Sequence, residues 1–380
     1  MKRAAPSIMI IAGEASGDVY GARLIDAFRI LHPEAHFFGI GGNRMRTAGM
    51  ELLYHIDQTA VMGFVEVVKR YPFFREMLDA CEQQYRERRP DVVVLIDYPG
   101  FNLRLAGKVK KAGGRVLYYI SPQVWAWGKD RALKMRGLVD HLACVFPFEE
   151  ALFNDRGIPT TYVGHPLVEI IERSERTSFL TTHALPDDRR ILGLFPGSRV
   201  QEVQRLLPTM LDGARMIREE CDCTIAIGAA GLPDELYAEA IGDVDDVHLL
   251  RDATHGLMQH SHAAIVASGT ATVETALYET PMVIVYRASW LNYQIGRRLI
   301  NVNHIGMVNI LAGRRIVPEL LQNDVQAEYI AEYMYPYFRN PRQRADTIAQ
   351  LREVKLLMGE PGASLRTAEL LDSMLGDKAA

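Results

Sequence analysis

The sequence predicts an α/β protein made of two doubly wound, Rossmann-like domains, each built on a parallel sheet. Short apolar runs alternate with segments of helical periodicity, which is typical of βαβ units around a buried parallel sheet. A polar stretch at residues 172–188 interrupts this alternation, which then starts again. The length of 380 residues also exceeds the usual size of one hydrophobic core, so two domains are expected.

The apolar runs give the expected strands and the domain boundaries. In the first half they span residues 7–13, 92–97, 115–121 and 141–148, and in the second half residues 191–196, 223–229, 247–251, 263–268 and 281–286. We expect a first domain over residues 1–166 and a second over residues 167–345. A C-terminal helix within residues 346–380 is expected to cross back to the first domain; its exchange between the subunits of a homodimer is the alternative.

The composition excludes several classes of protein. Hydrophobic residues make up 48% and charged residues 24% of the chain, a balance typical of globular proteins. A net charge of -4 lacks the basic face that nucleic-acid binding requires, so neither DNA nor RNA is an expected partner. No apolar run reaches the roughly 18–20 residues of a spanning helix. The four cysteines are too sparse for a disulfide framework or a zinc site, which favours the cytoplasm.

Two glycine turns in the second half are candidate phosphate sites. Each follows an expected strand and precedes an expected helix, where backbone N–H groups and the helix dipole favour an anion. One such turn could equally be a helix cap, but two in one domain favour a nucleotide; the Gly-Lys-Ser/Thr ending of a P-loop is missing. Beyond the second turn, an acidic residue can accept hydrogen bonds from a ribose. The first glycine turn is Gly197, Ser198 and Arg199, the second is Ser268, Gly269 and Thr270, and the acidic residue is Glu274.

The corresponding positions of the first half suit a sugar. Glu14, Ser16 and Asp18 lie at the first βα turn, where an open α/β sheet exposes its ligand crevice, and can bind hydroxyls. Ser16 or Asp18 could instead only cap the helix. Asp97 ends strand 92–96, where a desolvated carboxylate can act as a general base on an acceptor hydroxyl. A structural Asp that caps the following loop is the alternative.

Three segments suggest contact with a lipid. The loop 121–128 carries Trp125 and Trp127, which suit a sugar face or a lipid-facing rim. Segments 61–75 and 290–298 combine apolar and basic side chains, as peripheral membrane proteins do, although each could be a core helix with solvated charges. The predicted acyl or membrane contacts are Val61, Met62, Phe64, Val65, Val68, Phe73, Phe74, Arg297 and Arg298.

Taken together, these segments resemble the lipid-A-disaccharide synthases, a family of bacterial glycosyltransferases. The motifs fall in family order through nearly the whole chain: AGEASGD, GIGG, VMGFVEV, IDYPGFN, YISPQVWAW, FPFE, VGHP, PGSR, ASGTATVE and NILAG. The resemblance implies the GT-B fold, with two Rossmann-like domains facing a central cleft. It also implies the reaction, in which UDP-2,3-diacylglucosamine donates its sugar, with inversion, to the 6-hydroxyl of 2,3-diacylglucosamine 1-phosphate (lipid X). The products would be a β-1,6-linked tetraacyl disaccharide 1-phosphate and UDP.

The resemblance also implies roles for the residues. Asp97 would be the base, and the N-terminal polar and aromatic residues would hold the acceptor or the sugar. The two glycine turns, Glu274 and Asn309 would bind UDP. GT-B enzymes generally use dipoles and an arginine where others use a divalent ion, so no metal or cofactor is expected. The protein would lie at the cytoplasmic face of the inner membrane, where its acylated substrates reside.

Three other functions stay open, and the first is a GT-B transferase that acts on a different lipid acceptor. A UDP-N-acetylglucosamine 2-epimerase would share the fold but would not need the apolar segment 61–75. A non-catalytic nucleotide-sugar or lipid-binding protein would not need Asp97 together with both glycine turns.

Overall fold

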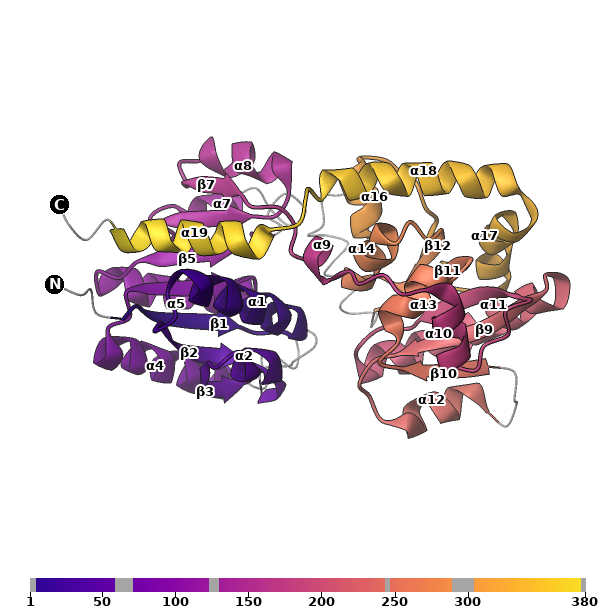
Figure 1. The fold of residues 1–380 in the computed structure, drawn as a ribbon, viewed down its shortest axis with the longest axis horizontal. Helices are drawn as coiled ribbons and strands as arrows, with labels where there is room; N and C mark the ends of the chain where they lie inside the picture. Colours follow the sequence, from indigo (N-terminus) through magenta and orange to yellow (C-terminus); the bar gives the residue numbers. More distant parts are fainter. Residues whose placement is uncertain (1–4, 59–70, 123–129, 243–246, 289–303, 377–380) are drawn as a thin grey trace. The chain divides into compact units, whose positions relative to one another are not determined.

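The computed structural model describes residues 5–58, 71–122, 130–242, 247–288 and 304–376. These residues form two compact units, which we describe separately (Figure 1). The first unit contains the described residues up to Glu169 and from Glu360 onward, and the second contains those from Ile170 to Gly359. The chain thus returns to the first unit after residue 359, and not at residue 345 as the sequence suggested.

The first unit is built on a seven-stranded parallel sheet. Its strands are β1 (Ser7–Ala12), β2 (His36–Gly41), β3 (Glu51–His55), β4 (Val92–Ile96), β5 (Val116–Tyr119), β6 (His141–Cys144) and β7 (Thr160–Tyr162). Their order is β3-β2-β1-β4-β5-β6-β7. The helices are α1 (Ala15–Leu31), α2 (Asn43–Thr47), η1 (Ile56–Gln58), α4 (Tyr71–Arg88), α5 (Pro99–Lys111), α7 (Asp130–Met135), α8 (Pro147–Asn154) and α9 (Leu167–Ile170). The chain direction across the sheet reverses between β1 and β4, so their carboxyl ends flank the switch point.

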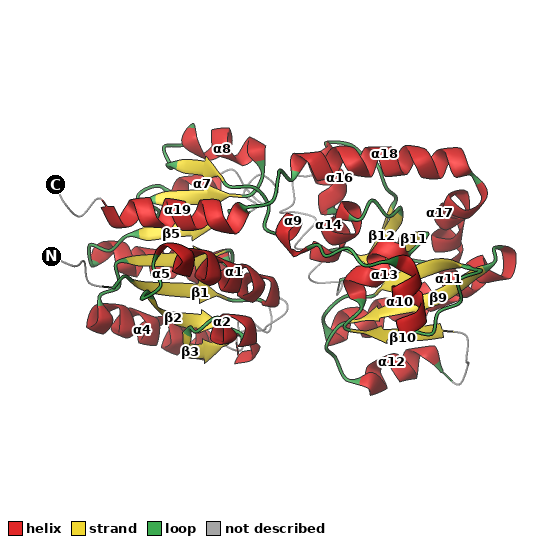
Figure 2. Cartoon of the chain, viewed as in Figure 1, coloured by secondary structure: helices red, strands yellow, loops and turns green. Residues whose placement is uncertain are grey.

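The second unit repeats this topology with six parallel strands. They are β8 (Arg190–Phe195), β9 (Cys223–Ala229), β10 (Val247–Arg251), β11 (Ala263–Ala267), β12 (Met282–Tyr286) and β13 (Glu319–Leu321). Their order is β10-β9-β8-β11-β12-β13, so the switch point lies between β8 and β11. The helices are α10 (Arg176–Thr182), α11 (Val200–Glu220), α12 (Asp234–Ile241), α13 (Thr254–His260), α14 (Thr270–Leu277), α16 (Met307–Ala312), η2 (Gln322–Asp324), α17 (Ala327–Arg339) and α18 (Pro341–Leu357). The predicted pair of doubly wound domains is therefore confirmed (Figure 2).

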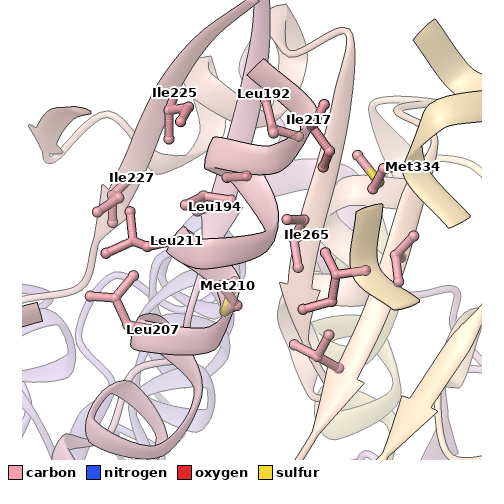
Figure 3. Packing of buried hydrophobic residues seen from close by; sticks show 14 of the residues in the cluster. Leu192, Leu194, Leu207, Met210, Leu211, Ile217, Ile225, Ile227, Ile265 and Met334 are labelled. Atoms are coloured by element: carbon pink, nitrogen blue, oxygen red, sulfur yellow. The ribbon is translucent and has the colours of Figure 1, made fainter. Parts of the chain in front are cut away.

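The central strands β1, β4 and β5 of the first sheet and β11 of the second are apolar and buried at nearly every position, because helices cover both faces of each sheet. In the second unit, α11 carries apolar residues three or four positions apart, which places them on one face of the helix. Figure 3 shows Leu207 and Leu211 of this face beside Leu194 and Ile227 of the sheet, all of them fully buried. Burying a leucine side chain contributes about 1.5–3 kcal/mol to stability. The apolar face of α11 therefore stabilises its packing on the sheet.

Two helices near the C-terminus explain where the chain crosses between units. Leu351 and Val354 of α18 are buried in a core of the second unit. The following helix α19 (Ala363–Gly376) packs on α1 in the first unit. Glu169 accepts hydrogen bonds from the N–H groups of Gly362 (2.8 Å) and Ser364 (2.9 Å), and so caps the start of α19. The apolar face of α18 therefore keeps residues 346–359 with the second unit.

Candidate active site

Asp97 lies at the switch point of the first unit, in a left-handed turn that buried side chains hold in place. Asp97 and Tyr98 have φ angles of 45° and 47°, which few residues other than glycine adopt. The buried Asn102 amide donates to the carbonyl oxygens of Ile96 (3.1 Å) and Asp97 (2.7 Å). The Tyr118 hydroxyl also donates to the Asp97 carbonyl, at 2.6 Å. These hydrogen bonds to the backbone of the strained turn give Asp97 a defined position.

The surroundings of Asp97 favour the protonated form of its carboxyl group. Desolvation by the surrounding protein raises the pKa of Asp97 to about 7, and the negative charges of Glu14 and Glu149 add to this rise. A hydrogen bond from the Tyr98 N–H opposes it. The residue as a whole is exposed to solvent, at the carboxyl end of its strand. A reachable carboxylate with a pKa near the working pH is suited to general base catalysis.

Glu149 is a buried carboxylate that the sequence analysis did not select. It is 1% exposed and accepts hydrogen bonds from the Ser121 hydroxyl and from the Phe146 N–H, at 3.2 Å for the latter. Its neighbour Phe148 is 46% exposed, and its ring stacks parallel to that of Phe146 at 5.8 Å between centroids. The only sign of Glu149 in the sequence is the FPFE motif, which resembles the family motif but does not indicate a role for the carboxylate.

The first βα turn meets the Asp97 turn through Gly13. A Cβ atom at Gly13 would collide with the Tyr98 ring, so the ring lies directly against the glycine backbone. Glu14, the next residue, is exposed at the start of α1, and its charge acts on Asp97. Ser16 is half-buried in the first turn of the same helix. Both residues therefore lie on the edge of the sheet that carries Asp97.

Asp18 has a structural role, which corrects its prediction as a sugar ligand. It is 5% exposed, and its carboxylate accepts hydrogen bonds from the N–H groups of Gly42 (2.7 Å), Arg44 (3.0 Å) and Met45 (3.0 Å). These donors belong to the N-terminal end of α2, which the carboxylate satisfies. Asp18 therefore caps a helix, as in the alternative interpretation of the sequence, but the helix is α2 and not α1, to which Asp18 belongs.

In the second unit, the two glycine turns lie on neighbouring strands. β8 and β11 pair directly in parallel, and the turns follow their carboxyl ends at the switch point. Gly197 (φ 111°) and Gly269 (φ 156°) adopt backbone conformations that favour glycine. Ser198, Arg199, Gly269 and Thr270 are exposed and Ser268 is half-buried. The turns thus expose the N-terminal ends of α11 and α14, where anions bind.

Two acidic side chains accompany these turns. Glu202, in the first turn of α11, accepts hydrogen bonds from the Ser198 N–H at 3.2 Å and from Nη1 of Arg199 at 3.0 Å. Glu274 is half-buried on α14, and its Oε1 lies 3.7 Å from Nε2 of His255 on α13. The sequence analysis missed His255 because it lies in a segment without a glycine turn. A carboxylate beside an imidazole can serve neighbouring hydroxyl groups such as those of a ribose.

Asn309 is the second predicted ligand that the structure corrects. It is fully buried, and its amide donates to the Val317 carbonyl (2.9 Å) and to Glu319 (2.7 Å). Its carbonyl oxygen accepts from the N–H groups of Ile316 (2.8 Å) and Val317 (3.1 Å). With both donors and both lone pairs engaged inside the unit, the side chain has no capacity left for a nucleotide.

Several predicted contacts lie outside the described residues: Val61, Met62, Phe64, Val65, Val68, Trp125, Trp127, Arg297 and Arg298. Phe73 and Phe74 are described and half-buried on α4, with their ring centroids 5.8 Å apart. Phe73 also meets the Tyr54 ring edge-on at 6.3 Å. These two rings therefore belong partly to the core of the first unit. Within the described ranges, no helix is long and apolar enough to cross a bilayer, and no group of three or more His, Cys, Asp or Glu could hold a metal.

Solved structures with the same fold include an epimerase and a glycosyltransferase. A UDP-N-acetylglucosamine 2-epimerase from Neisseria meningitidis, solved with UDP-N-acetylglucosamine, aligns with a TM-score of 0.67 and 12% identity over 97% of this chain and all of its own. The calicheamicin glycosyltransferase aligns with a TM-score of 0.62 and 14% identity over the whole of both chains. At these identities the likeness shows the fold alone, which is that of the GT-B enzymes.

Sequence comparison shows the family. The model of the family described as lipid-A-disaccharide synthetase matches residues 8–370. Relatives named lipid-A-disaccharide synthase include those of Trichlorobacter lovleyi, 42% identical over 97% of both chains, and Geobacter metallireducens, 41% identical over 98% of both chains. That of Syntrophus aciditrophicus is 42% identical over 95% of this chain and 96% of its own. The chain therefore belongs to the lipid-A-disaccharide synthase family and is a glycosyltransferase of lipid A biosynthesis.

Proposed function

We propose that this enzyme transfers 2,3-diacylglucosamine from UDP to the 6-hydroxyl of 2,3-diacylglucosamine 1-phosphate, with inversion at the anomeric carbon. The observation that carries the proposal is Asp97, an exposed residue at the switch point of the first unit whose carboxyl pKa is raised to about 7. An inverting transfer needs one base on the acceptor side, and the raised pKa of Asp97 supports it in that role. The names of the relatives support the substrate class.

The transfer is then a single displacement. The Asp97 carboxylate takes the proton of the acceptor hydroxyl, whose oxygen forms a bond to the anomeric carbon while the bond from that carbon to the UDP oxygen breaks. The electron pair of the broken bond leaves with UDP. The N–H groups of the two glycine turns and the Arg199 guanidinium stabilise this negative charge.

Other residues position the two substrates. Glu14 and Ser16 share the edge of the sheet with Asp97 and would accept or donate hydrogen bonds to sugar hydroxyls. Glu274, with His255 3.7 Å away, would hold the ribose of the donor. Trp125 and Trp127 are proposed to contact the sugar or acyl chains, as the sequence predicts. Asp18 and Asn309 have no ligand role in this proposal.

The acylated substrates place the enzyme at a membrane. We propose peripheral contact with the cytoplasmic face of the inner membrane through segments 61–75 and 290–298, whose apolar and basic side chains suit anionic lipids. Flotation with vesicles of anionic and of zwitterionic lipid tests this contact. We expect binding only to the anionic vesicles. If a Phe73→Ser, Phe74→Ser double variant floated as the wild type does, these two rings would not take part in the membrane contact.

The reaction is tested with both acylated substrates in detergent, following UDP release and disaccharide formation. Asp97→Asn should lower kcat by about 10²–10⁴-fold while the Kd for UDP stays near that of the wild type. The wild-type kcat/KM should rise with pH and level off above about 7, because only the ionised Asp97 accepts a proton. The matched control is Asp26→Asn, because Asp26 is exposed. Asp91 does not serve as a control, since it accepts a hydrogen bond from the Ser7 N–H. UDP release that does not depend on the acceptor would refute the transfer, and full activity in Asp97→Asn would refute the base.

A further inference from the structure

The carboxylate of Glu202 occupies the first glycine turn. Its Oε2 accepts the hydrogen bond of the Ser198 N–H at 3.2 Å, and its Oε1 pairs with Nη1 of Arg199 at 3.0 Å. The side chain is 18% exposed, whereas that of Arg199 is 44% exposed. A Cβ atom at Gly197 would collide with Oε2, so the carboxylate is packed directly on the glycine backbone. The turn thus already holds a negative group of its own protein.

The donors that Glu202 engages are those proposed to bind the diphosphate. A backbone N–H has one hydrogen to donate, and an Arg199 nitrogen that is paired with Oε1 is not fully available to a phosphate oxygen. The negative charge of the Glu202 carboxylate also repels a diphosphate bound at the same turn.

We propose that Glu202 is an internal competitor for the donor diphosphate: it occupies the first glycine turn in the free enzyme, is displaced by the UDP-sugar, and returns as UDP leaves. The inference rests on the proposed function, because it assumes that this turn binds the diphosphate. The carboxylate keeps the turn in its phosphate-binding conformation without a ligand, and it weakens the hold on UDP. The weaker hold on UDP favours turnover, because release of the charged product often limits kcat.

Calorimetric titration of the full chain tests this inference with two ligands, UDP and uridine. Glu202→Gln keeps an oxygen that can accept the Ser198 hydrogen bond but removes the charge that competes with phosphate. We expect the Kd for UDP to fall about three- to tenfold, as for the loss of one nearby like charge at a partly exposed site, while the Kd for uridine stays the same. The Ki for UDP as a product should fall by the same factor.

Matched variants separate competition from a simple helix cap. Glu219→Gln removes the same charge from an exposed position near the other end of α11 and should leave both Kd values unchanged. Arg199→Ala should weaken UDP binding and spare uridine. If Glu202 only stabilised the helix, Glu202→Gln would bind both ligands more weakly, and this result would overturn the inference.

The remaining outcomes distinguish the inference from the proposed function. A wild-type enzyme that binds UDP, beside a Glu202→Gln variant that binds it equally or more weakly, overturns the inference and leaves the function standing. Absence of UDP binding by both proteins overturns the two together. Thermal unfolding of each variant confirms that the titrated protein is folded.

Discussion

Replacement of Asn309 by alanine should destabilise the second unit and should not remove a nucleotide contact. The substitution deletes the acceptor of the Ile316 and Val317 N–H groups and the donor to the Val317 carbonyl, all of them buried. A buried donor without a partner costs about 1–3 kcal/mol. At about 1.5 kcal/mol for each of the two N–H groups, the expected loss is about 3 kcal/mol, or roughly 6–12 °C in Tm for a unit of this size.

Thermal unfolding monitored by calorimetry measures this loss as a lower Tm of the transition that includes the second unit. The matched control is Asn323→Ala, which removes the same amide from an exposed position and should change the free energy of unfolding by less than about 0.5 kcal/mol. UDP binding is then measured well below the transition of the variant. Its Kd should remain that of the wild type.

One result would refute this reasoning. If Asn309→Ala kept the wild-type Tm and lost UDP binding at low temperature, the hydrogen bonds to Ile316 and Val317 would contribute little to stability. Asn309 would then be a donor-site residue, as the sequence first suggested.

Three further predictions follow from the first unit. The pKa of Asp97 rises from an ordinary 3.8 to about 7 on folding, so the folded chain binds the extra proton between these values and stability falls as pH rises through this window. Asp97→Asn should therefore raise the Tm at pH 8, and a Tm gain equally large at pH 4 would contradict this account. Asp18→Ala should cost about 3 kcal/mol in urea unfolding because it leaves three N–H groups unpaired, of which those of Gly42 and Met45 are buried; the exposed Asp26→Ala is the control, and equal midpoints would refute the capping role. Gly13→Ala pushes the Tyr98 ring aside and should lower kcat at least about tenfold by moving the catalytic turn, with recovery in the Gly13→Ala, Tyr98→Ala double variant; no recovery would mean that the methyl group acts elsewhere.

The sequence predicted the architecture well because the relevant signals are local. Apolar runs mark strands that are covered on both faces, and the glycine turns at Gly197 and Gly269 mark where strands pass into helices. Parallel strands expose their carboxyl ends on one edge of a sheet, so the pairing of β8 with β11 brings these two turns together. The second domain boundary was misplaced because α18 and α19 are both helical, and only packing shows which unit each belongs to.

The same local reasoning selected Asp97, Glu14 and Glu274, which stay predictions, together with Asp18 and Asn309, whose side chains the protein itself engages. All five are polar residues in or near a turn, and a sequence does not show which backbone groups come to meet them. The N–H groups that engage Asp18 belong to a helix that begins at residue 43, on the far side of β2 in the chain. Likewise, the missed Glu149 acts on Asp97 from another strand end.

The sequence by itself determined the two parallel-sheet domains, the family, and the turns at which ligands are expected, because periodicity and turn chemistry depend on neighbouring residues. Only the tertiary structure decided which polar side chains are already engaged by the protein and which remain exposed. Glu202 illustrates the difference: its spacing from Ser198 allowed a contact, but the close packing on Gly197 appears only in three dimensions. Hydrogen-bond capacity and desolvation are set by groups distant in the chain, so they follow from the fold and not from the motif.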